Sequence, residues 1–270
     1  MKESVLQGKT VLLIGACGGM GCAAACCLSE NGCTVIGIDR EGASVPDGMR
    51  LLTADVTDPQ AIGAACSTLR QEGVTLDAIV YMAGVYDADS LIEIDESRMR
   101  RIFEINVFGA YRTIRAFSPL LHAGSRVVLV TSELAPLDPL PFTGLYGITK
   151  STLERYAFSL AMELQLLDIS VSVIRPGAVQ TPLLGGSVKR IEAFAANTEH
   201  YPDIAAKFLR VTNAVEAKAV PPEVVAKRIK TALTARRPRF CYKLNRNPLL
   251  LLYGILPKQW KLIAIKTYLK

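Results

Sequence analysis

The stretch Thr10-Val-Leu-Leu-Ile-Gly-Ala-Cys-Gly-Gly-Met-Gly21 decides the fold of this chain. Its first five residues form a continuous apolar run, which is typical of a strand buried on both faces of a parallel sheet. The glycines after the run predict a sharp turn into a helix that extends from Gly19 to Glu30. Gly15 permits the turn, Gly19 lets the backbone approach a pyrophosphate, and Gly21 allows close packing of helix on strand.

The unpaired N–H groups at the start of that helix make the turn a candidate dinucleotide-binding site. The residues assigned to the turn are Gly15, Cys17, Gly18, Gly19, Met20 and Gly21. Glycine clusters also occur in ordinary turns. Here a strand precedes the cluster and a helix follows it, which is the context that phosphate binding requires.

Outside this stretch, apolar strands alternate with helices along most of the chain. The predicted strands are Thr10–Ile14, Cys33–Ile38, Met49–Ala54, Leu76–Met82, Arg126–Thr131, Ile169–Ile174 and Phe240–Tyr242. The predicted helices after the first begin at Asp58-Pro59 and span Glu96–Leu121, Leu145–Leu167 and Glu223–Thr234. This alternation predicts right-handed crossovers and an α/β fold, with a doubly wound parallel sheet of seven strands and helices on both faces.

The length of 270 residues suits one domain, residues 1–270, better than two small ones. Two segments fall outside the alternation of strands and helices. Residues 183–219 follow a strand end, where open α/β sheets bind ligands, and are interpreted as a substrate lid; an additional core helix is the alternative. Residues 244–270 are expected to form a C-terminal helical tail.

The composition indicates a cytoplasmic protein. No apolar stretch approaches the roughly 20 residues that span a bilayer, and the short polar N-terminus does not resemble a signal peptide. The seven cysteines include no Cys-x-x-Cys pair and are interpreted as inert thiols in a reducing compartment. With only His122 and His200 available as imidazole ligands, no metal site is expected.

Charge is distributed unevenly. From Lys218 onward there are thirteen Lys and Arg residues and one acid, Glu223, so this part carries +12 and the remainder −6 of the net +6. The asymmetry indicates an acidic partner, an anionic membrane surface or an anionic substrate. The simpler alternative is a solvated helix surface, or a tail paired with acids elsewhere in an oligomer. Nucleic-acid binding is not expected, because regularly interleaved aromatic residues and any recognisable module are missing from the sequence.

Acidic residues after the second and third strands predict how the dinucleotide is recognised. Asp39 stands 18 residues after Gly21, where a carboxylate accepts hydrogen bonds from ribose hydroxyls and repels a 2′-phosphate. The expected cofactor is therefore NAD, with NADP as the alternative because Arg40 is suited to a phosphate. Asp55 and Val56 are expected to contact the adenine.

Tyr146 and Lys150 lie four residues apart on a predicted helix, so their side chains share one face. A lysine cation near a phenol favours the phenolate and lowers the tyrosine pKa, which permits proton exchange near neutral pH. Together with Ser132, this pair predicts the interconversion of a carbonyl and an alcohol beside the dinucleotide.

These residues resemble the short-chain dehydrogenase/reductase family, whose members are single-domain Rossmann-fold enzymes. The resemblance extends from about Gly8 to Tyr242. It rests on Gly15-x-x-x-Gly19-x-Gly21, Asp55-Val56, Ala83-Gly84, Asn106, Ser132, Tyr146-x-x-x-Lys150 and Pro176-Gly177 through Thr181, in that order. Single matches arise by chance, but the full ordered set on the predicted elements is highly specific.

The resemblance implies a role for each matched position. Tyr146 would be the general acid/base, Lys150 would lower its pKa and bind the nicotinamide ribose, and Ser132 would hydrogen-bond the substrate oxygen. Asn106 would hold a water that links Lys150 to solvent. The remaining matched positions would contact the cofactor: Ala83, Gly84, Pro176, Gly177, Val179 and Thr181. Val179 and Thr181 would bind its carboxamide.

The chain departs from the family at two places. Tyr81-Met82 replaces two asparagines before Ala83-Gly84, so hydrogen bonds that steady the central strands must come from elsewhere. Glu133 follows Ser132 where an uncharged residue is commoner; its carboxylate would either orient a polar substrate or point away.

The tail also resembles the C-terminal region of steroid- and retinol-type members, in which terminal helices flank the substrate mouth. We therefore expect an NAD-dependent enzyme acting on a bulky lipophilic secondary alcohol, either a hydroxysteroid or a bile acid. The alternatives are a 3-oxoacyl-type or small-ketone reductase and a non-catalytic dinucleotide-sensing protein. A homodimer or homotetramer is expected, and the basic tail is a candidate for peripheral membrane contact.

Overall fold

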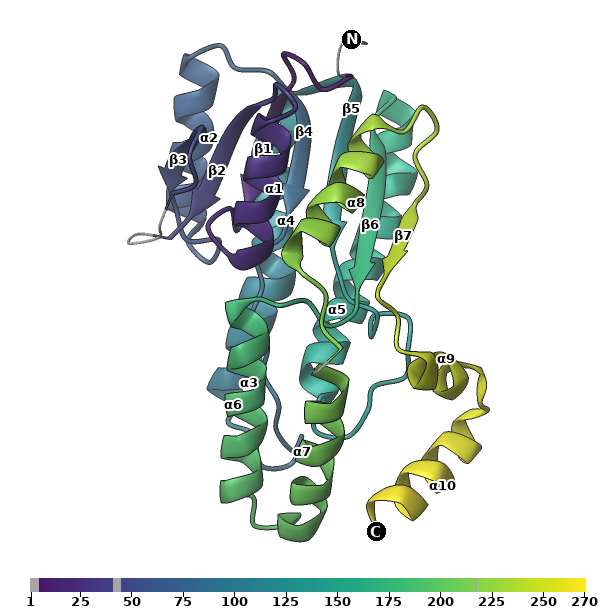
Figure 1. Cartoon of the computed structure of the whole chain (residues 1–270). Helices are drawn as coiled ribbons and strands as arrows, with labels where there is room; N and C mark the ends of the chain where they lie inside the picture. Colours follow the sequence, from purple (N-terminus) through teal and green to yellow (C-terminus); the bar gives the residue numbers. More distant parts are fainter. Residues whose placement is uncertain (1–4, 41–44, 217) are drawn as a thin grey trace.

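In a computed structural model, which describes residues 5–40, 45–216 and 218–270, one parallel sheet organises the chain (Figure 1). The strand order is β3-β2-β1-β4-β5-β6-β7, and all neighbours are parallel. The strands are β1 (Thr10–Ile14), β2 (Thr34–Asp39), β3 (Met49–Thr53), β4 (Leu76–Tyr81), β5 (Leu121–Val130), β6 (Ser170–Pro176) and β7 (Cys241–Leu244). The predicted seven-stranded, doubly wound Rossmann fold is thus confirmed.

Helices cover both faces of the sheet (Figure 1). One face carries α1 (Gly19–Ser29) and α8 (Pro222–Thr234), whose apolar residues pack with Leu13 and Val80. The other face carries α2 (Pro59–Gln71), α4 (Gly109–Phe117) and α5 (Gly144–Leu164), which pack on Leu12 and Ile79. Successive strand residues point to opposite faces, so the continuous apolar run of β1 supplies both cores.

The predicted long helix Glu96–Leu121 is wrong in its details. The chain forms α3 (Glu96–Phe103), a π-helical segment η1 (Glu104–Phe108), α4, and a short 3₁₀ turn η2 (Ser118–Leu120). Pro119 cannot continue the α-helix, and β5 begins at Leu121 rather than at the predicted Arg126, with a register shift before it settles against β4. Helix α5 also ends three residues early, in the 3₁₀ turn η3 (Gln165–Leu167).

The segment predicted as a lid forms two helices, α6 (Pro182–Asn197) and α7 (Pro202–Glu216), beyond the carboxyl ends of the strands (Figure 1). A β-bridge between Val179 and Val220 joins the two ends of this segment. Phe142, from the loop before α5, packs with Phe194 of α6 and Phe208 of α7 in a small separate core. This segment is therefore anchored to the body by apolar contacts.

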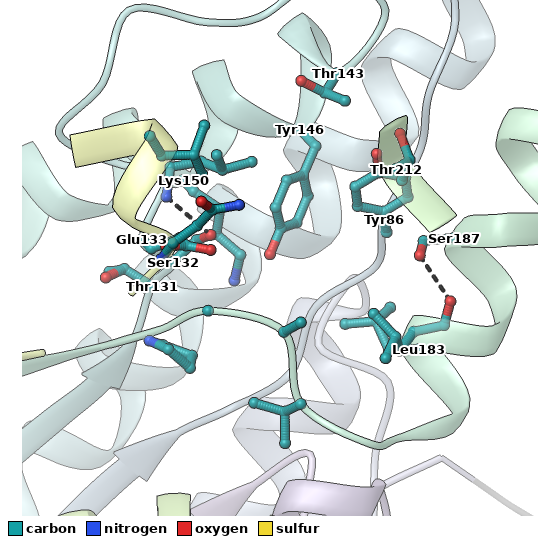
Figure 2. Close-up of a pocket in the computed structure, with 18 of the residues that line it drawn as sticks. Tyr86, Thr131, Ser132, Glu133, Thr143, Tyr146, Lys150, Leu183, Ser187 and Thr212 are labelled. Atoms are coloured by element: carbon teal, nitrogen blue, oxygen red, sulfur yellow. Dashed lines mark hydrogen bonds between the residues drawn. The ribbon is translucent and has the colours of Figure 1, made fainter. Parts of the chain in front are cut away.

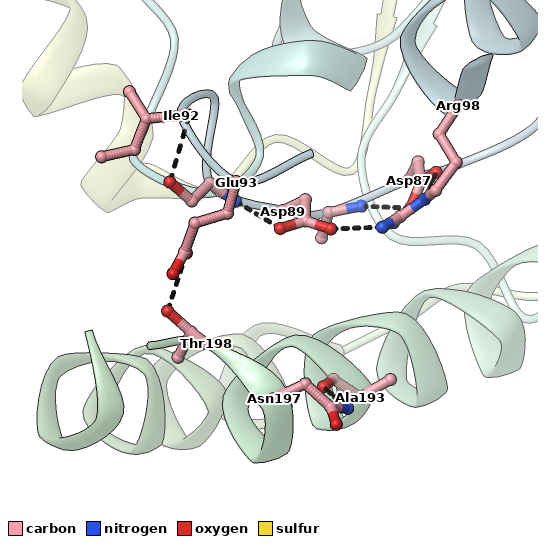
Figure 3. A network of polar contacts seen from close by, with 10 residues as sticks. Asp87, Asp89, Ile92, Glu93, Arg98, Ala193, Asn197 and Thr198 are labelled. Atoms are coloured by element: carbon pink, nitrogen blue, oxygen red, sulfur yellow. Dashed lines mark hydrogen bonds and ion pairs between the residues drawn. The ribbon is translucent and has the colours of Figure 1, made fainter. Parts of the chain in front are cut away.

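A second set of contacts holds the turn between α6 and α7 (Figure 3). The carboxylate of Glu93 accepts hydrogen bonds from the Thr198 hydroxyl at 2.8 Å and from the backbone N–H groups of Glu199 and His200 at 2.9 and 3.0 Å. Burial acts to raise the pKa of Glu93, but these hydrogen bonds lower it to about 2. Arg98 pairs with two acids of the same loop, Asp87 and Asp89.

The tail forms α9 (Pro248–Ile255) and α10 (Lys258–Leu269). Helix α10 returns toward α7, where Leu269 joins the core around Phe142. The Lys261 ammonium, which is almost fully buried, pairs with Asp138 at 2.8 Å. Lid and tail therefore lie on the same side of the molecule, beyond the strand ends (Figure 1).

Candidate active site

The glycine turn after β1 is shaped for close approach by a ligand. Gly15 has a φ of +78°, and a Cβ on it would lie 2.7 Å from the backbone nitrogen of Ala83. A Cβ on Gly21 would lie 2.2 Å from the Gly15 carbonyl oxygen, so only glycine fits at either position. No side chain caps the start of α1, which leaves its first N–H groups to bind phosphate. The turn fits a dinucleotide pyrophosphate.

An adjoining cavity of about 890 Å³ extends over the ends of β2 and β3. The predicted residues that line it are Gly15, Cys17, Gly18, Asp39, Arg40, Asp55, Val56, Ala83 and Gly84. One Asp39 oxygen accepts a hydrogen bond from the backbone N–H of Cys17 at 2.8 Å, which holds the carboxylate beside the glycine turn. Burial raises the pKa of Asp55, but two hydrogen bonds from Thr57 and nearby arginines bring it below the usual value.

Two cationic residues of this cavity were missed from the sequence. Arg100 and Arg101 of α3 line it together with Arg40. Their position depends on how the loop after β4 returns over the cavity, and no local motif marks that path. The three guanidinium groups accompany the carboxylates of Asp39, Asp55 and Glu104 in the same lining, so both signs of charge meet at the adenosine end of the site.

The predicted catalytic side chains line a second pocket of about 280 Å³ (Figure 2). Ser132 follows β5, and Tyr146 and Lys150 lie on α5. The other predicted residues in the lining are Met20, Gly84, Glu133, Pro176, Gly177, Val179 and Thr181. Gly84 also lines the cavity above the glycine turn, so the tyrosine lies on the same edge of the sheet as the dinucleotide cleft.

The Tyr146 hydroxyl points into this pocket between Ser132 and Tyr86 (Figure 2). Burial raises its pKa from 10.0 to about 12, and a hydrogen bond with Ser132 acts in the opposite direction. The expectation that Lys150 lowers the tyrosine pKa does not hold in this structure, because desolvation outweighs other effects. The Lys150 nitrogen lies 5.8 Å from the centre of the Tyr146 ring.

Lys150 is itself buried, and only about 5% of its surface is exposed. Its ammonium donates a hydrogen bond to the Val130 carbonyl at 3.2 Å. Desolvation lowers its pKa from 10.5 to about 8, because an apolar environment disfavours the charged form. The lysine therefore titrates close to physiological pH.

Asn106 is fully buried in the π-helical segment and joins three elements. Its side-chain oxygen accepts from the Val85 N–H at 2.8 Å, and its nitrogen donates to the Val85 carbonyl and to the Thr149 hydroxyl. A Cβ on Gly84 would lie 3.2 Å from the Asn106 oxygen and 3.3 Å from the Lys150 nitrogen. Asn106 thus fixes the loop after β4 against α5, the helix that carries Lys150.

The family's two asparagines are replaced here, so other residues must supply the hydrogen bonds that steady the central strands. Tyr81 supplies one of them. Its side chain is fully buried, and its hydroxyl donates to the Ile105 carbonyl at 2.8 Å. Ile105 precedes Asn106 in the π-helical segment. A Cβ on Gly109 would lie 2.7 Å from the Tyr81 oxygen, so glycine makes room for the phenol.

Glu133 faces the tail. One carboxylate oxygen accepts from the Asn247 backbone N–H at 2.8 Å, just before α9. Burial raises the pKa of this carboxyl, and the bond to Asn247 and the charge of Arg246 act against that rise. Glu133 lines the pocket, so the same side chain connects the catalytic loop to the tail.

Several other pocket residues were missed from the sequence. The ring of Tyr86 packs against Tyr146, with centroids 4.8 Å apart. Leu249 and Leu250 of α9 and Val211 of α7 reach the pocket from segments remote in the chain. The position of Tyr86, two residues after Ala83-Gly84, was the one sequence feature that could have indicated a pocket residue. The other contacts depend on how residues 183–219 and the tail fold back.

Over residues 5–40, 45–216 and 218–270, no three His, Cys, Asp or Glu side chains gather as a metal site would require. Within the same ranges, every helix is too short or too polar to cross a bilayer. All seven cysteines are free thiols.

Comparison with known proteins gives consistent matches. A family model described as short chain dehydrogenase matches residues 9–191. The 1-hydroxy-2-glutathionyl-2-methyl-3-butene dehydrogenase of Rhodococcus sp. (strain AD45) is 33% identical, over 65% of this chain and 80% of its own. The 17-beta-hydroxysteroid dehydrogenase type 1 of Mus musculus is 32% identical over 73% of this chain, and the match spans 57% of the mouse protein.

A solved structure, that of a short-chain dehydrogenase from Streptomyces avermitilis, superposes with a TM-score of 0.75 at 26% identity. The match covers 97% of this chain and 95% of the other. The likeness therefore extends over nearly the whole length of both chains.

Proposed function

Because the chain belongs to the short-chain dehydrogenase family, we propose that this oxidoreductase uses NAD(H) to interconvert a secondary alcohol and a ketone. One observation carries the proposal. Ser132, Tyr146 and Lys150 line a single pocket that shares Gly84 with the cavity above the glycine turn. A substrate oxygen at Tyr146 would therefore lie beside the dinucleotide cleft.

Each catalytic side chain has a distinct task. The Tyr146 hydroxyl donates its proton to the carbonyl oxygen during reduction and accepts one from the alcohol during oxidation. Ser132 donates a hydrogen bond to the same oxygen and stabilises the charge that develops there. The bound nicotinamide supplies or accepts the hydride. Lys150 binds the ribose and places a positive charge near the phenol, and Asn106 holds the water that relays protons from it.

The protonation state of the free site favours proton donation. With a pKa of about 12, Tyr146 is protonated at neutral pH. Oxidation of an alcohol requires the phenolate, so it should be favoured as the pH rises. We place the other matched residues, from Gly15 to Thr181, around the cofactor in the roles that the family implies.

Replacing Tyr146 by Phe tests the mechanism. The variant keeps the ring and loses the proton-transferring hydroxyl, so turnover should fall by roughly 10²–10⁴-fold while NADH binding, measured by fluorescence titration, is retained. Unchanged turnover would contradict the mechanism. It would also favour the alternative of a dinucleotide-sensing protein in which the residue has no chemical role.

We further propose that the substrate is bulky and lipophilic, with a hydroxysteroid or bile acid as the leading class. Support comes from the lining of the pocket, where leucines of the lid and tail face Ser132 and Tyr146. The mouse relative named above acts on hydroxysteroids by its name. In this proposal residues 183–219 serve as the substrate lid and residues 244–270 close the opposite side.

A panel of steroids, bile acids, retinoids and acyl thioesters, assayed with NAD and with NADP, tests the substrate class. We expect turnover of a sterol with NAD, because Asp39 lies beside the glycine turn and repels a 2′-phosphate. No turnover of any sterol would defeat the substrate assignment. Strong preference for NADPH would support the alternative, a 3-oxoacyl-type or small-ketone reductase; Arg40, Arg100 and Arg101 are the residues that favour it.

The assembly and location of the protein are also proposals. Exposed apolar side chains on α4 and α5, among them Tyr111, Phe158 and Met162, support a homodimer or homotetramer through these helices. Free thiols support a cytoplasmic location. Trp260 and Leu262, exposed beside the lysines of the tail, support peripheral membrane contact.

A further inference from the structure

A further cavity, of about 780 Å³, adjoins the outer side of the substrate pocket that contains Tyr146. The two share three lining residues: Val211 of α7, Asn247 before α9 and Leu249 of α9. This further cavity shares no lining residue with the cavity beside the glycine turn. It is therefore a continuation of the substrate pocket and not of the cofactor cleft. We call it the basic mouth; the described residues that line it are Lys207, Arg210, Val211, Lys218, Asn247, Pro248, Leu249 and Tyr268.

The charges on the described side chains of the basic mouth are all positive. Lys207, Arg210 and Lys218 line it, and no Asp or Glu is found among the described side chains of its lining. Arg210 and Lys218 form no ion pair with another described residue, whereas Lys207 donates a hydrogen bond to the main-chain oxygen of Lys270 at 2.8 Å. By contrast, Lys261 of the same tail is paired with Asp138. Uncompensated cations around one concavity attract and concentrate an anion.

The volumes indicate that a large substrate reaches this region. Ligand pockets commonly measure about 300–1,000 Å³, and the inner pocket of about 280 Å³ also includes residues assigned to the nicotinamide. A bulky lipophilic substrate therefore cannot be held by the inner pocket alone. Because Val211, Asn247 and Leu249 border both spaces, the far end of such a molecule would enter the basic mouth.

We propose that the basic mouth binds an anionic group at the end of the substrate remote from the reacting carbon, so that the natural substrate is an anionic amphiphile. Arg210 and Lys218 form charge-assisted hydrogen bonds to that group, and the Tyr268 hydroxyl adds a donor at the rim. A carboxylate, sulfate or phosphate has the required chemistry. This inference rests on the proposed function, since it takes the reacting alcohol to lie at Tyr146.

The experiment compares a steroid acid that carries a secondary alcohol with its methyl ester, which has the same apolar body and no charge. The wild type should show a kcat/KM about tenfold higher for the acid, equivalent to about 1.4 kcal/mol. In the double variant Arg210→Gln/Lys218→Gln the preference should vanish through a higher KM for the acid, with kcat and the kinetics of the ester unchanged. The preference should also weaken as salt is added.

The control is Lys227→Gln/Arg228→Gln on α8, which removes the same charge outside the basic mouth. It should retain the preference for the acid. Two results would overturn the inference while the dehydrogenase activity stands. One is an equal kcat/KM for acid and ester in the wild type. The other is a preference for the acid that falls by the same factor in the Arg210→Gln/Lys218→Gln variant and in the control variant.

Calorimetric binding of the acid and the ester in the presence of NADH separates the remaining outcomes. If neither compound is turned over but the acid binds and the Arg210→Gln/Lys218→Gln variant loses it, the basic mouth stands and the proposed reaction fails. If neither compound binds, the proposed substrate class and the inference both fall.

Discussion

Tyr81 connects a central strand to the segment that carries Asn106. Its buried hydroxyl donates to the Ile105 carbonyl. We expect Tyr81→Phe to lower the free energy of unfolding by about 1 kcal/mol, because one buried hydrogen bond is lost without a change in packing. Urea unfolding of the two proteins measures the difference.

The matched control for this change is Tyr156→Phe. Tyr156 packs against the same core, and its hydroxyl forms no hydrogen bond with any other residue that the structure describes. A smaller loss of stability is expected there. If the two variants lose the same amount, the bond to Ile105 contributes nothing specific.

Lys150 illustrates how a functional group reduces stability. Its pKa of about 8 in the folded protein lies below 10.5, so the folded state binds its proton less tightly than the unfolded state. The charged lysine therefore destabilises the fold below pH 8, and this penalty disappears as the pH rises from about 8 to about 10.5. We expect Lys150→Met to abolish turnover and to raise the free energy of unfolding at pH 7 by roughly 1–3 kcal/mol.

Denaturant unfolding of wild type and Lys150→Met at pH 7 and at pH 9.5 checks the prediction. The gain of the variant should shrink at the higher pH, since the wild-type lysine is then largely neutral. A variant that is less stable than the wild type at pH 7 would show that the hydrogen bond to Val130 outweighs the desolvation of the ammonium.

At this scale, residues within local motifs could be predicted from the sequence. The structure places Gly15, Ser132, Tyr146 and Lys150 at one edge of the sheet, as the spacing predicted. The shift of the tyrosine pKa could not be predicted in the same way. It depends on how completely the lid and tail bury the phenol, and those contacts join residues far apart in the chain.

Among the elements, regular periodicity predicted the core strands and helices well and failed where side-chain contacts alter the backbone. The helix expected over Glu96–Leu121 contains the π-helical segment, in which the Ile105 carbonyl and the Asn106 side chain form hydrogen bonds with Tyr81 and Val85. The helix propensities of the residues do not indicate such hydrogen bonds. The wider turn at a functional residue agrees with where π-helical turns occur in general.

The turn between α6 and α7 is held by a single carboxylate. Replacing Glu93 by Ala removes the acceptor for the N–H groups of Glu199 and His200. Hydrogen exchange at these two amides should then become at least about tenfold faster, because opening this turn costs less free energy. Asp95→Ala, at the start of α3 and without a side-chain cap, is the control.

The same carboxylate predicts a pH dependence. Because the pKa of Glu93 is depressed to about 2, its stabilising effect is present above the ordinary value of 4.5 and is lost as the pH falls through about 2. Amide protection at Glu199 and His200 in the wild type should therefore persist at pH 4. Loss of protection by pH 4 would mean that the contact does not hold the turn.

For the whole molecule, the exposed apolar strip on α5 predicts self-association. Met162 is 55% exposed and Phe158 is 52% exposed, and a charge placed there should separate the subunits because it would be buried unpaired in the interface. We expect a dimer or tetramer by light scattering and a shift to monomer for Met162→Glu. Ala64→Glu, on the exposed side of α2, should leave the assembly intact. A monomeric wild type would refute the interface.

Proton transfer and substrate selectivity depend on different parts of this chain. The groups that move the proton all precede Thr181, whereas the leucines and cations that surround the remote end of the pocket follow it. Grafting everything after Thr181 from a homologue with another preference should thus transplant that preference and retain the groups that transfer the proton. The boundary at the first residue of α6 is a natural splice point for diversification.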